Sequence, residues 1–241
     1  MSEWWTYRLS DFLLFSPETY YRLIELYNAA IWPGQILAIA GGVATVILLR
    51  RRGALPGRLL AAILALAWLF VAWAYLYARY ATINWAAPYF AIGFAVQAVL
   101  LILSGTMFGR MSFRSTSSRA WLVGFGMCVF AVFAQPLIGP LVGRGWTEME
   151  VFGLSPDPTV ACTLAVVLAA DRPRWELLVL PVLWCAITGA TLWAMAAPDA
   201  WLMPLLAVTA IVVLTLVQAS QRTDALAYRG HFRRAGRNSE G

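Results

Sequence analysis

The chain has 241 residues, of which 61% are hydrophobic and only 12% are charged, whereas an average soluble domain has about 25% charged residues. A soluble protein with this composition would expose large apolar patches, so the composition excludes a soluble globular fold and predicts that lipid surrounds most of the chain. The net charge of +6 comes from arginines that are concentrated in a few loops and in the C-terminal tail. It does not indicate a nucleic-acid partner.

Residues 1–30 are expected to form an external, amphipathic N-terminal segment. Ser16 can cap a helix that begins at Pro17, since serine and proline are favoured at these two positions. At 100° per residue, one face of this helix is apolar and the opposite face is charged. The apolar face has Tyr20, Leu23, Ile24, Tyr27 and Ile31, and the charged face has Glu18, Arg22 and Glu25. We expect this helix to lie at the outer membrane interface, either as a cover over the protein or as a gate or docking helix.

Residues 31–218 contain seven apolar segments, and about 20 apolar residues are needed to cross the hydrocarbon of a bilayer. The segments are residues 31–49, 59–78, 86–107, 120–141, 157–170, 177–197 and 200–218. The predicted fold is therefore an all-α, polytopic membrane helix bundle with seven transmembrane helices.

The arginines predict the orientation of these segments. Fourteen of the eighteen lie in the loops after the first, third and fifth segments or in the C-terminal tail, and there is no lysine. The opposite side has only four arginines but eight of the twelve acidic residues. The positive-inside rule then predicts that the N-terminus is external and the C-terminus cytoplasmic.

The fourth and fifth segments are interrupted by proline. Pro136 removes a backbone hydrogen bond and frees the carbonyl of Val132, to which Gln135 could donate. The fifth segment has only about 13 residues after Pro158, or about 20 Å of helix, which is shorter than a hydrocarbon core of about 30 Å. Asp157 is expected to cap its N-terminus.

Once the topology is assigned, the polar side chains of the bundle lie mostly in its outer half. These residues are Gln35, Asn84, Gln97 (near mid-membrane), Gln135, Asp157, Thr159, Thr163 and Thr188. Because polar groups in hydrocarbon need partners or water, the bias toward one leaflet suggests an outward-facing polar cavity. The alternative is that these side chains only join helices by hydrogen bonds.

Residues 219–241 form a basic tail, which we expect to be an irregular cytoplasmic strand near anionic lipid. The only histidine, His231, lies in this tail, and the three cysteines occur singly in apolar runs. The sequence therefore predicts no haem, no metal site and no other cofactor. It also lacks the residue patterns of an intramembrane hydrolase, so we expect no catalytic residues.

Two stretches carry a resemblance to a known family. SDFLLFSPETYYRLIELYNAAIWP, at residues 10–33, and SPDPTVACTLAVVLAA, at residues 155–170, resemble the marker sequences of a bacterial family of multi-pass membrane proteins known only as a domain of unknown function. The second stretch has Ala165 where a glycine would be expected. The resemblance covers nearly the whole chain and implies a bacterial inner-membrane location, but no activity.

Two functions are consistent with these features. The first is a small uncoupled transporter or channel for a neutral or anionic solute, which the polar cavity and the interrupted helices favour. The second is a non-catalytic accessory or scaffold subunit of a larger membrane complex, which the aliphatic inner halves, the twelve tryptophans and the N-terminal helix favour. The expected partners are the lipid bilayer, other membrane subunits and anionic lipid at the tail.

Overall fold

In the computed structural model, residues 15–113, 118–172 and 174–237 are described, and the described side chains end at Ser220. These residues are helical apart from turns and one isolated bridge between Gly53 and Phe113. The elements are α1 (Pro17–Ala30), α2 (Gly34–Leu49), α3 (Ala54–Phe70), η3 (Val71–Tyr77), η4 (Tyr80–Thr82), α4 (Ala87–Leu101), η5 (Ile102–Met107), α5 (Arg119–Val129), η6 (Phe130–Ala134), α6 (Gln135–Leu141), η7 (Trp146–Glu148), α7 (Pro156–Ala169), η8 (Trp175–Leu177), α8 (Val179–Ala194) and α9 (Leu202–Arg237). The all-α class is confirmed for the described part of the chain.

Five of the described helices are long and apolar enough to cross a membrane. They span Ala54–Thr82, Ala87–Met107, Arg119–Leu141, Trp175–Ala194 and Leu202–Ser220. Helices α1 and α2 would make a sixth crossing if they count as one span, but a bend of 93° separates them. Helix α7 is apolar but shorter. The chain thus has five or six helices of membrane-spanning length, which is compatible with an integral membrane protein.

Helix α1 begins as the sequence predicts. The Ser16 hydroxyl accepts a hydrogen bond from the backbone N–H of Thr19, and Pro17 is the first helical residue. Ile24 and Tyr27 on the apolar face are buried, and on the charged face Arg22 pairs with Glu25 at 2.6 Å. Residues 1–14 of the predicted N-terminal segment lie outside the described residues.

Helix α7 lies at the centre of the fold. All fourteen of its residues are buried, and it contacts α3, α5, α8 and α9. The contact with α5 is close because a Cβ at Gly124 would lie 2.6 Å from the carbonyl oxygen of Ala165. A helix without a charged, solvent-facing stripe is expected to be enclosed by other helices, and α7 is enclosed in this way.

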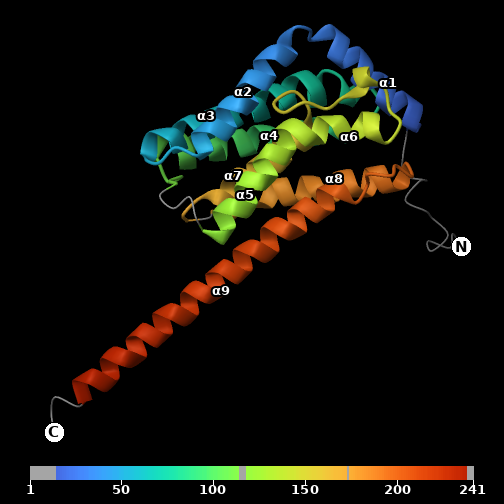
Figure 1. Ribbon diagram of the computed structural model, residues 1–241. Helices are drawn as coiled ribbons and strands as arrows, with labels where there is room; N and C mark the ends of the chain where they lie inside the picture. Colours follow the sequence, from blue (N-terminus) through green and yellow to red (C-terminus); the bar gives the residue numbers. More distant parts are fainter. Residues whose placement is uncertain (1–14, 114–117, 173, 238–241) are drawn as a thin grey trace, which may run out of the picture.

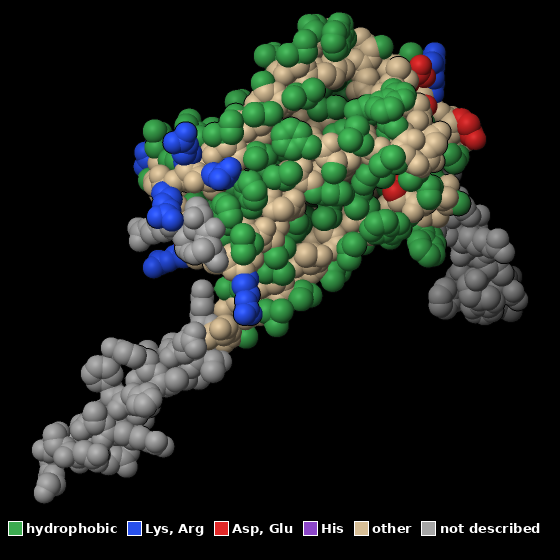
Figure 2. Space-filling model, in the orientation of Figure 1, with side chains coloured by type: hydrophobic (Ala, Val, Ile, Leu, Met, Phe, Trp, Pro, Cys, Tyr) green, Lys and Arg blue, Asp and Glu red, His purple; other side chains and the backbone are tan. Residues whose placement is uncertain are grey.

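Charged side chains separate to the two ends of the bundle, with an apolar band between them (Figure 2). Exposed arginines follow α2, α4 and α7, at the end where α9 leaves the bundle. The described acidic side chains lie mostly at the opposite end, which includes α1 and the loop before α7. This separation agrees with the asymmetry along the sequence.

Helix α9 corrects the prediction for the tail. The backbone continues as one helix from Leu202 to Arg237, so residues 219–237 are not an irregular strand. Figure 1 shows that α9 extends well beyond the other helices. A run of Gln, Arg, Thr, Asp, Ala and Leu has adequate helix propensity once an apolar helix precedes it, because elongation is easier than nucleation.

Candidate functional site

Four of the predicted polar residues lie on α7 or directly against it. Asp157 lies in the first turn of α7, and its Oδ1 atom accepts hydrogen bonds from Trp184 Nε1 at 2.7 Å and from Thr188 Oγ1 at 2.9 Å. Both donors belong to α8, so the carboxylate joins α7 to α8. These distances fall in or near the range of charge-assisted hydrogen bonds.

The predicted capping role of Asp157 is wrong. Helix α7 begins at Pro156 after Ser155, whose backbone is extended, and no side chain caps it. Proline is favoured at the first helical position, and the sequence offers Pro156 and Pro158 for it. Because the earlier proline is used, the Asp157 side chain is directed at α8 instead of at the N–H groups of its own helix.

The two threonines of α7 each make two hydrogen bonds. Thr159 Oγ1 donates to the carbonyl of Ser155 at 2.7 Å and accepts from the backbone N–H of Gly153 at 2.9 Å. Thr163 Oγ1 donates to the carbonyl of Thr159 at 2.8 Å and accepts from Trp68 Nε1 at 2.8 Å. These contacts fix the turn before α7 and join α7 to α3.

The other four predicted residues lie apart from this group. Asn84 Oδ1 accepts from the backbone N–H of Ala86 at the start of α4, at 2.9 Å. Gln97 Nε2 donates to the carbonyl of Leu177 at 3.0 Å, which joins α4 to η8. Gln35 Nε2 donates to the carbonyl of Asn28 at 2.7 Å, across the bend between α1 and α2.

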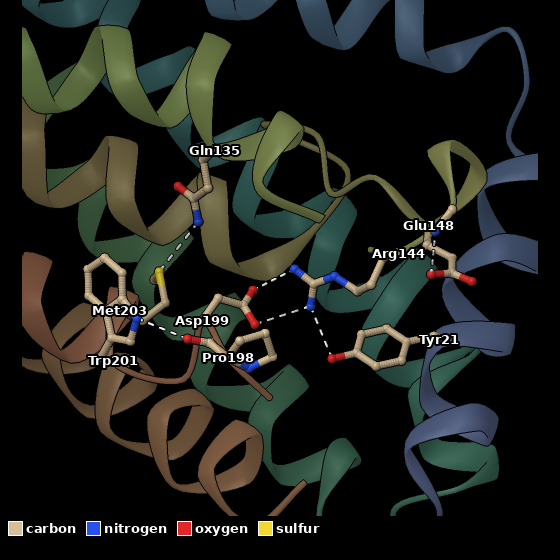
Figure 3. A network of polar contacts seen from close by, with 9 residues as sticks. Tyr21, Gln135, Arg144, Glu148, Pro198, Asp199, Trp201 and Met203 are labelled. Atoms are coloured by element: carbon tan, nitrogen blue, oxygen red, sulfur yellow. Dashed lines mark hydrogen bonds and ion pairs between the residues drawn. The ribbon is translucent and has the colours of Figure 1, made fainter. Parts of the chain in front are cut away.

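Gln135 also differs from the prediction. Its Nε2 atom donates to the sulfur of Met203 in α9 at 3.5 Å (Figure 3) instead of to the carbonyl of Val132. The segment before Pro136 is the π-helical η6, and the N–H of Gln135 donates to the carbonyl of Phe130. The wider turn carries the chain into Pro136 without the side-chain contact that we expected.

The structure therefore pairs Asp157 with Thr188 between α7 and α8, directs Thr159 to the turn before α7 and Thr163 to α3, and distributes the rest over the bundle. Each of the eight residues makes at least one hydrogen-bond contact within the chain, as expected for side chains that join helices. Whether they also line a path for a solute stays a prediction.

A second polar network lies at the end of the bundle that includes α1, and the sequence did not predict its pairing (Figure 3). Arg144 donates to Asp199 at 2.5 Å and to the hydroxyl of Tyr21 at 3.0 Å. It thus ties the loop after α6 to the loop before α9 and to α1. Burial lowers the pKa of Arg144, but Asp199 and Tyr21 together raise it above its ordinary value.

The partners in this network could not be found from spacing, because 55 residues separate Arg144 from Asp199. The only signal was that both residues were assigned to the outer side.

Glu150 lies in the same loop as Arg144. Burial raises the pKa of Glu150 to about 8, and the negative charge of Asp157 adds to the shift.

The chemistry available to these groups is limited. Within the described residues, no group of three or more His, Cys, Asp or Glu side chains could hold a metal ion. Asp157 accepts from two neutral donors, and Arg144 is neutralised by Asp199. Both arrangements stabilise contacts between elements.

Comparison with known proteins places the chain at the level of a family. No curated protein matches it, and no solved structure matches it. The sequence profile of DUF6064, described as a family of unknown function, matches residues 17–225. This range includes α1 and the whole helical bundle with its central α7, so the chain belongs to the DUF6064 family.

Proposed function

We propose that this protein crosses a bacterial inner membrane seven times, with its N-terminal segment periplasmic and its C-terminus cytoplasmic. The separation of charged side chains supports the orientation, since the end rich in arginine is retained in the cytoplasm. The seven crossings are α2, the five long helices and α7, while α1, which a bend of 93° separates from α2, lies at the periplasmic interface.

The position of α7 supports its role as a crossing despite its length. Fourteen residues span about 21 Å at 1.5 Å per residue, which is less than the hydrocarbon thickness of about 30 Å. The flanks of α7 contact opposite ends of the bundle. The carbonyl of Leu154 accepts from the hydroxyl of Tyr27 in α1, and the backbone N–H of Asp171 donates to the carbonyl of Ser112 in the arginine-rich loop. Irregular backbone is tolerated at membrane depth where protein encloses it.

The turn before α7 satisfies this condition. The N–H of Ser155 donates to the carbonyl of Val151, and the Ser155 hydroxyl accepts from the N–H of Val151. The N–H of Gly153 is taken by Thr159. These backbone groups therefore need no water.

Within this topology, the function best supported is that of a non-catalytic accessory or scaffold subunit. The observation that carries this proposal is that α7 is buried along its whole length, with its polar side chains bonded to neighbouring helices. A conduction path along the centre of the bundle would need these contacts to open. The extension of α9 past the bundle gives a partner, or anionic lipid, a basic helix to bind.

The test is a purification in mild detergent with mass-spectrometric identification of the material that remains bound. The full chain should retain a membrane partner, and a chain that ends at Ser220 should lose it. Purified protein in vesicles should pass no solute. Retention of no partner by either chain, together with solute flux, would overturn the proposal.

An uncoupled transporter is the second candidate, and one observation favours it. The amide oxygens of Gln97 and Gln135 are buried without a hydrogen-bond donor, although buried acceptors are usually satisfied. A solute with hydroxyl or amide donors would satisfy them. If this candidate is right, Gln135→Leu and Thr163→Val should abolish flux in vesicles and leave assembly intact.

A further inference from the structure

Two exposed arginines at the arginine-rich end of the bundle have no acidic partner among the described residues. Arg58 lies near the start of α3, and Arg110 follows η5. The three salt bridges between described residues involve other arginines. Figure 2 shows that basic side chains gather at this end. Both guanidinium groups are therefore available to bind an anion.

Close packing of α3 against η5 and the loop after it fixes the part of the chain that carries these arginines. A Cβ at Gly57 of α3 would overlap the carbonyl oxygen of Met111, and a Cβ at Gly105 of η5 would overlap the Cβ of Ala61. Glycine at these two positions lets the backbones approach closely. The two elements therefore form a rigid unit that carries Arg58 on one segment and Arg110 on the other.

The segment from Phe108 to Arg110 positions both guanidinium groups. Gly109 has a φ of +56°, which favours glycine, and a Cβ there would lie 3.1 Å from Nε and 3.3 Å from Nη2 of Arg58. The Arg58 guanidinium thus packs against the space that a side chain would fill. The Arg110 guanidinium lies over the Phe108 ring, with Cζ 4.7 Å from the ring centroid. Neither contact neutralises the positive charge.

Exposed apolar side chains adjoin both arginines in the chain, within one turn of Arg58 on α3 and directly before Arg110. They are Leu55, Leu59, Met107 and Phe108. One span begins at Ala54 and the next ends at Met107, so in the proposed topology the arginines lie near the level of the lipid headgroups. The combination favours a ligand that has both an anionic group and an apolar chain.

We propose that Arg58 and Arg110 bind the phosphodiester of an anionic phospholipid in the cytoplasmic leaflet. Each guanidinium can donate two parallel hydrogen bonds to phosphate oxygens, and an acyl chain would lie along α3 past Leu59. A zwitterionic lipid has the same phosphate, but its cationic group would be repelled by the arginines of this end. The inference rests on the proposed topology and does not depend on the role as a scaffold subunit.

The experiment is a lipid titration of the delipidated full-length protein in detergent, read by native mass spectrometry. The probes are phosphatidylglycerol and phosphatidylcholine with the same dioleoyl chains, and inorganic phosphate is the competitor. Phosphatidylglycerol should bind severalfold more tightly than phosphatidylcholine, and inorganic phosphate should not displace it. Equal binding of the two lipids would overturn the inference, and displacement by inorganic phosphate would assign the arginines to a free anion instead.

A matched pair of arginine substitutions tests the location. Arg58→Gln should weaken phosphatidylglycerol binding about tenfold, as expected for lost hydrogen bonds between charged groups, and Arg58→Lys should have a smaller effect because it retains the charge without the fork of donors. Arg50→Gln is the control, since Arg50 is exposed at the same end but its guanidinium lies over Phe125 of α5. This variant should lose less than about twofold. Equal losses in Arg58→Gln and Arg50→Gln would show a diffuse attraction to the basic end and overturn the inference.

Gly109→Ala tests the geometry without a change in charge. The added Cβ should displace the Arg58 guanidinium and weaken phosphatidylglycerol binding severalfold, whereas Gly126→Ala, which has open space, should not. Gel filtration of each variant verifies that it is folded, and if the strained Gly109→Ala does not fold, Arg58→Gln and Arg50→Gln decide the matter. Loss of lipid selectivity in a protein that still retains its membrane partner would contradict this inference alone and leave the scaffold role intact.

Discussion

The contribution of the Thr188–Asp157 hydrogen bond to the packing of α7 against α8 can be measured as a change in the free energy of unfolding. Thr188→Val preserves the shape of the side chain and removes the hydroxyl that donates to Asp157 at 2.9 Å. Interhelical hydrogen bonds in membranes contribute about 0.6 kcal/mol on average and about 1.7 at most, while bonds to a charged group contribute about 1.5–3 kcal/mol. Since Asp157 is buried with one other donor, we expect a loss of about 1.5 kcal/mol in the free energy of unfolding.

Thr191→Val is the matched control. Thr191 lies one turn further along α8, and its hydroxyl donates only to the carbonyl of Ile187 in the same helix. This bond lies within one helix, and the Ile187 carbonyl keeps its backbone donor. Removal of the Thr191 hydroxyl should therefore cost less than about 0.5 kcal/mol. Unfolding in mixed micelles of increasing dodecyl sulfate content, followed by circular dichroism, measures both variants.

A double-mutant cycle with Asp157→Asn completes the test. If the two side chains interact directly, the effect of Thr188→Val should shrink to about half or less once the carboxylate is an amide. If Thr188→Val is no more destabilising than Thr191→Val, or if the effects of Thr188→Val and Asp157→Asn are fully additive, then Asp157 does not join α7 to α8 as described.

Three further predictions concern the centre of the bundle and the loop before α7. Gly124→Ala should destabilise by several kcal/mol in the same unfolding assay, because its Cβ would lie 2.6 Å from a carbonyl oxygen of α7; Gly126→Ala has open space and should be neutral. A membrane-permeant oxidant should join Cys128 to Cys162, whose sulfurs are 3.7 Å apart, and peptide mapping would detect the product. Burial raises the pKa of Glu150 from an ordinary value of 4.5 to about 8. The folded protein should therefore lose stability as the pH rises from about 4.5 to about 8. Glu150→Gln should raise the melting temperature at pH 9 but not at pH 4.

The local features of the fold could be predicted from the sequence. The start of α1 depends on Ser16 and Pro17, which act through their own backbone, and the apolar segments depend on composition. The charges at the two ends of the bundle follow from arginines beside helix ends. Each of these signals is contained in a few consecutive residues, so no tertiary contact was needed to recognise it.

The tertiary features could not be predicted in the same way. Asp157 was expected to bond to its own helix, but Trp184 and Thr188 from α8 compete for it, and their proximity follows from packing. Arg144 and Asp199 pair across two loops for the same reason. The helical continuation of α9 past residue 218 was missed because a polar composition alone does not distinguish a solvent-exposed helix from a disordered strand.

The side on which each flank of α7 lies is the most direct test of the proposed topology. In a background without the three native cysteines, Thr147→Cys before α7 and Arg172→Cys after it place one exposed thiol at each flank. Membrane-impermeant maleimide added to sealed, oriented vesicles should label these two positions from opposite sides, with Thr147→Cys on the periplasmic side. Labelling of both from the same side would contradict a seventh crossing through the centre of the bundle.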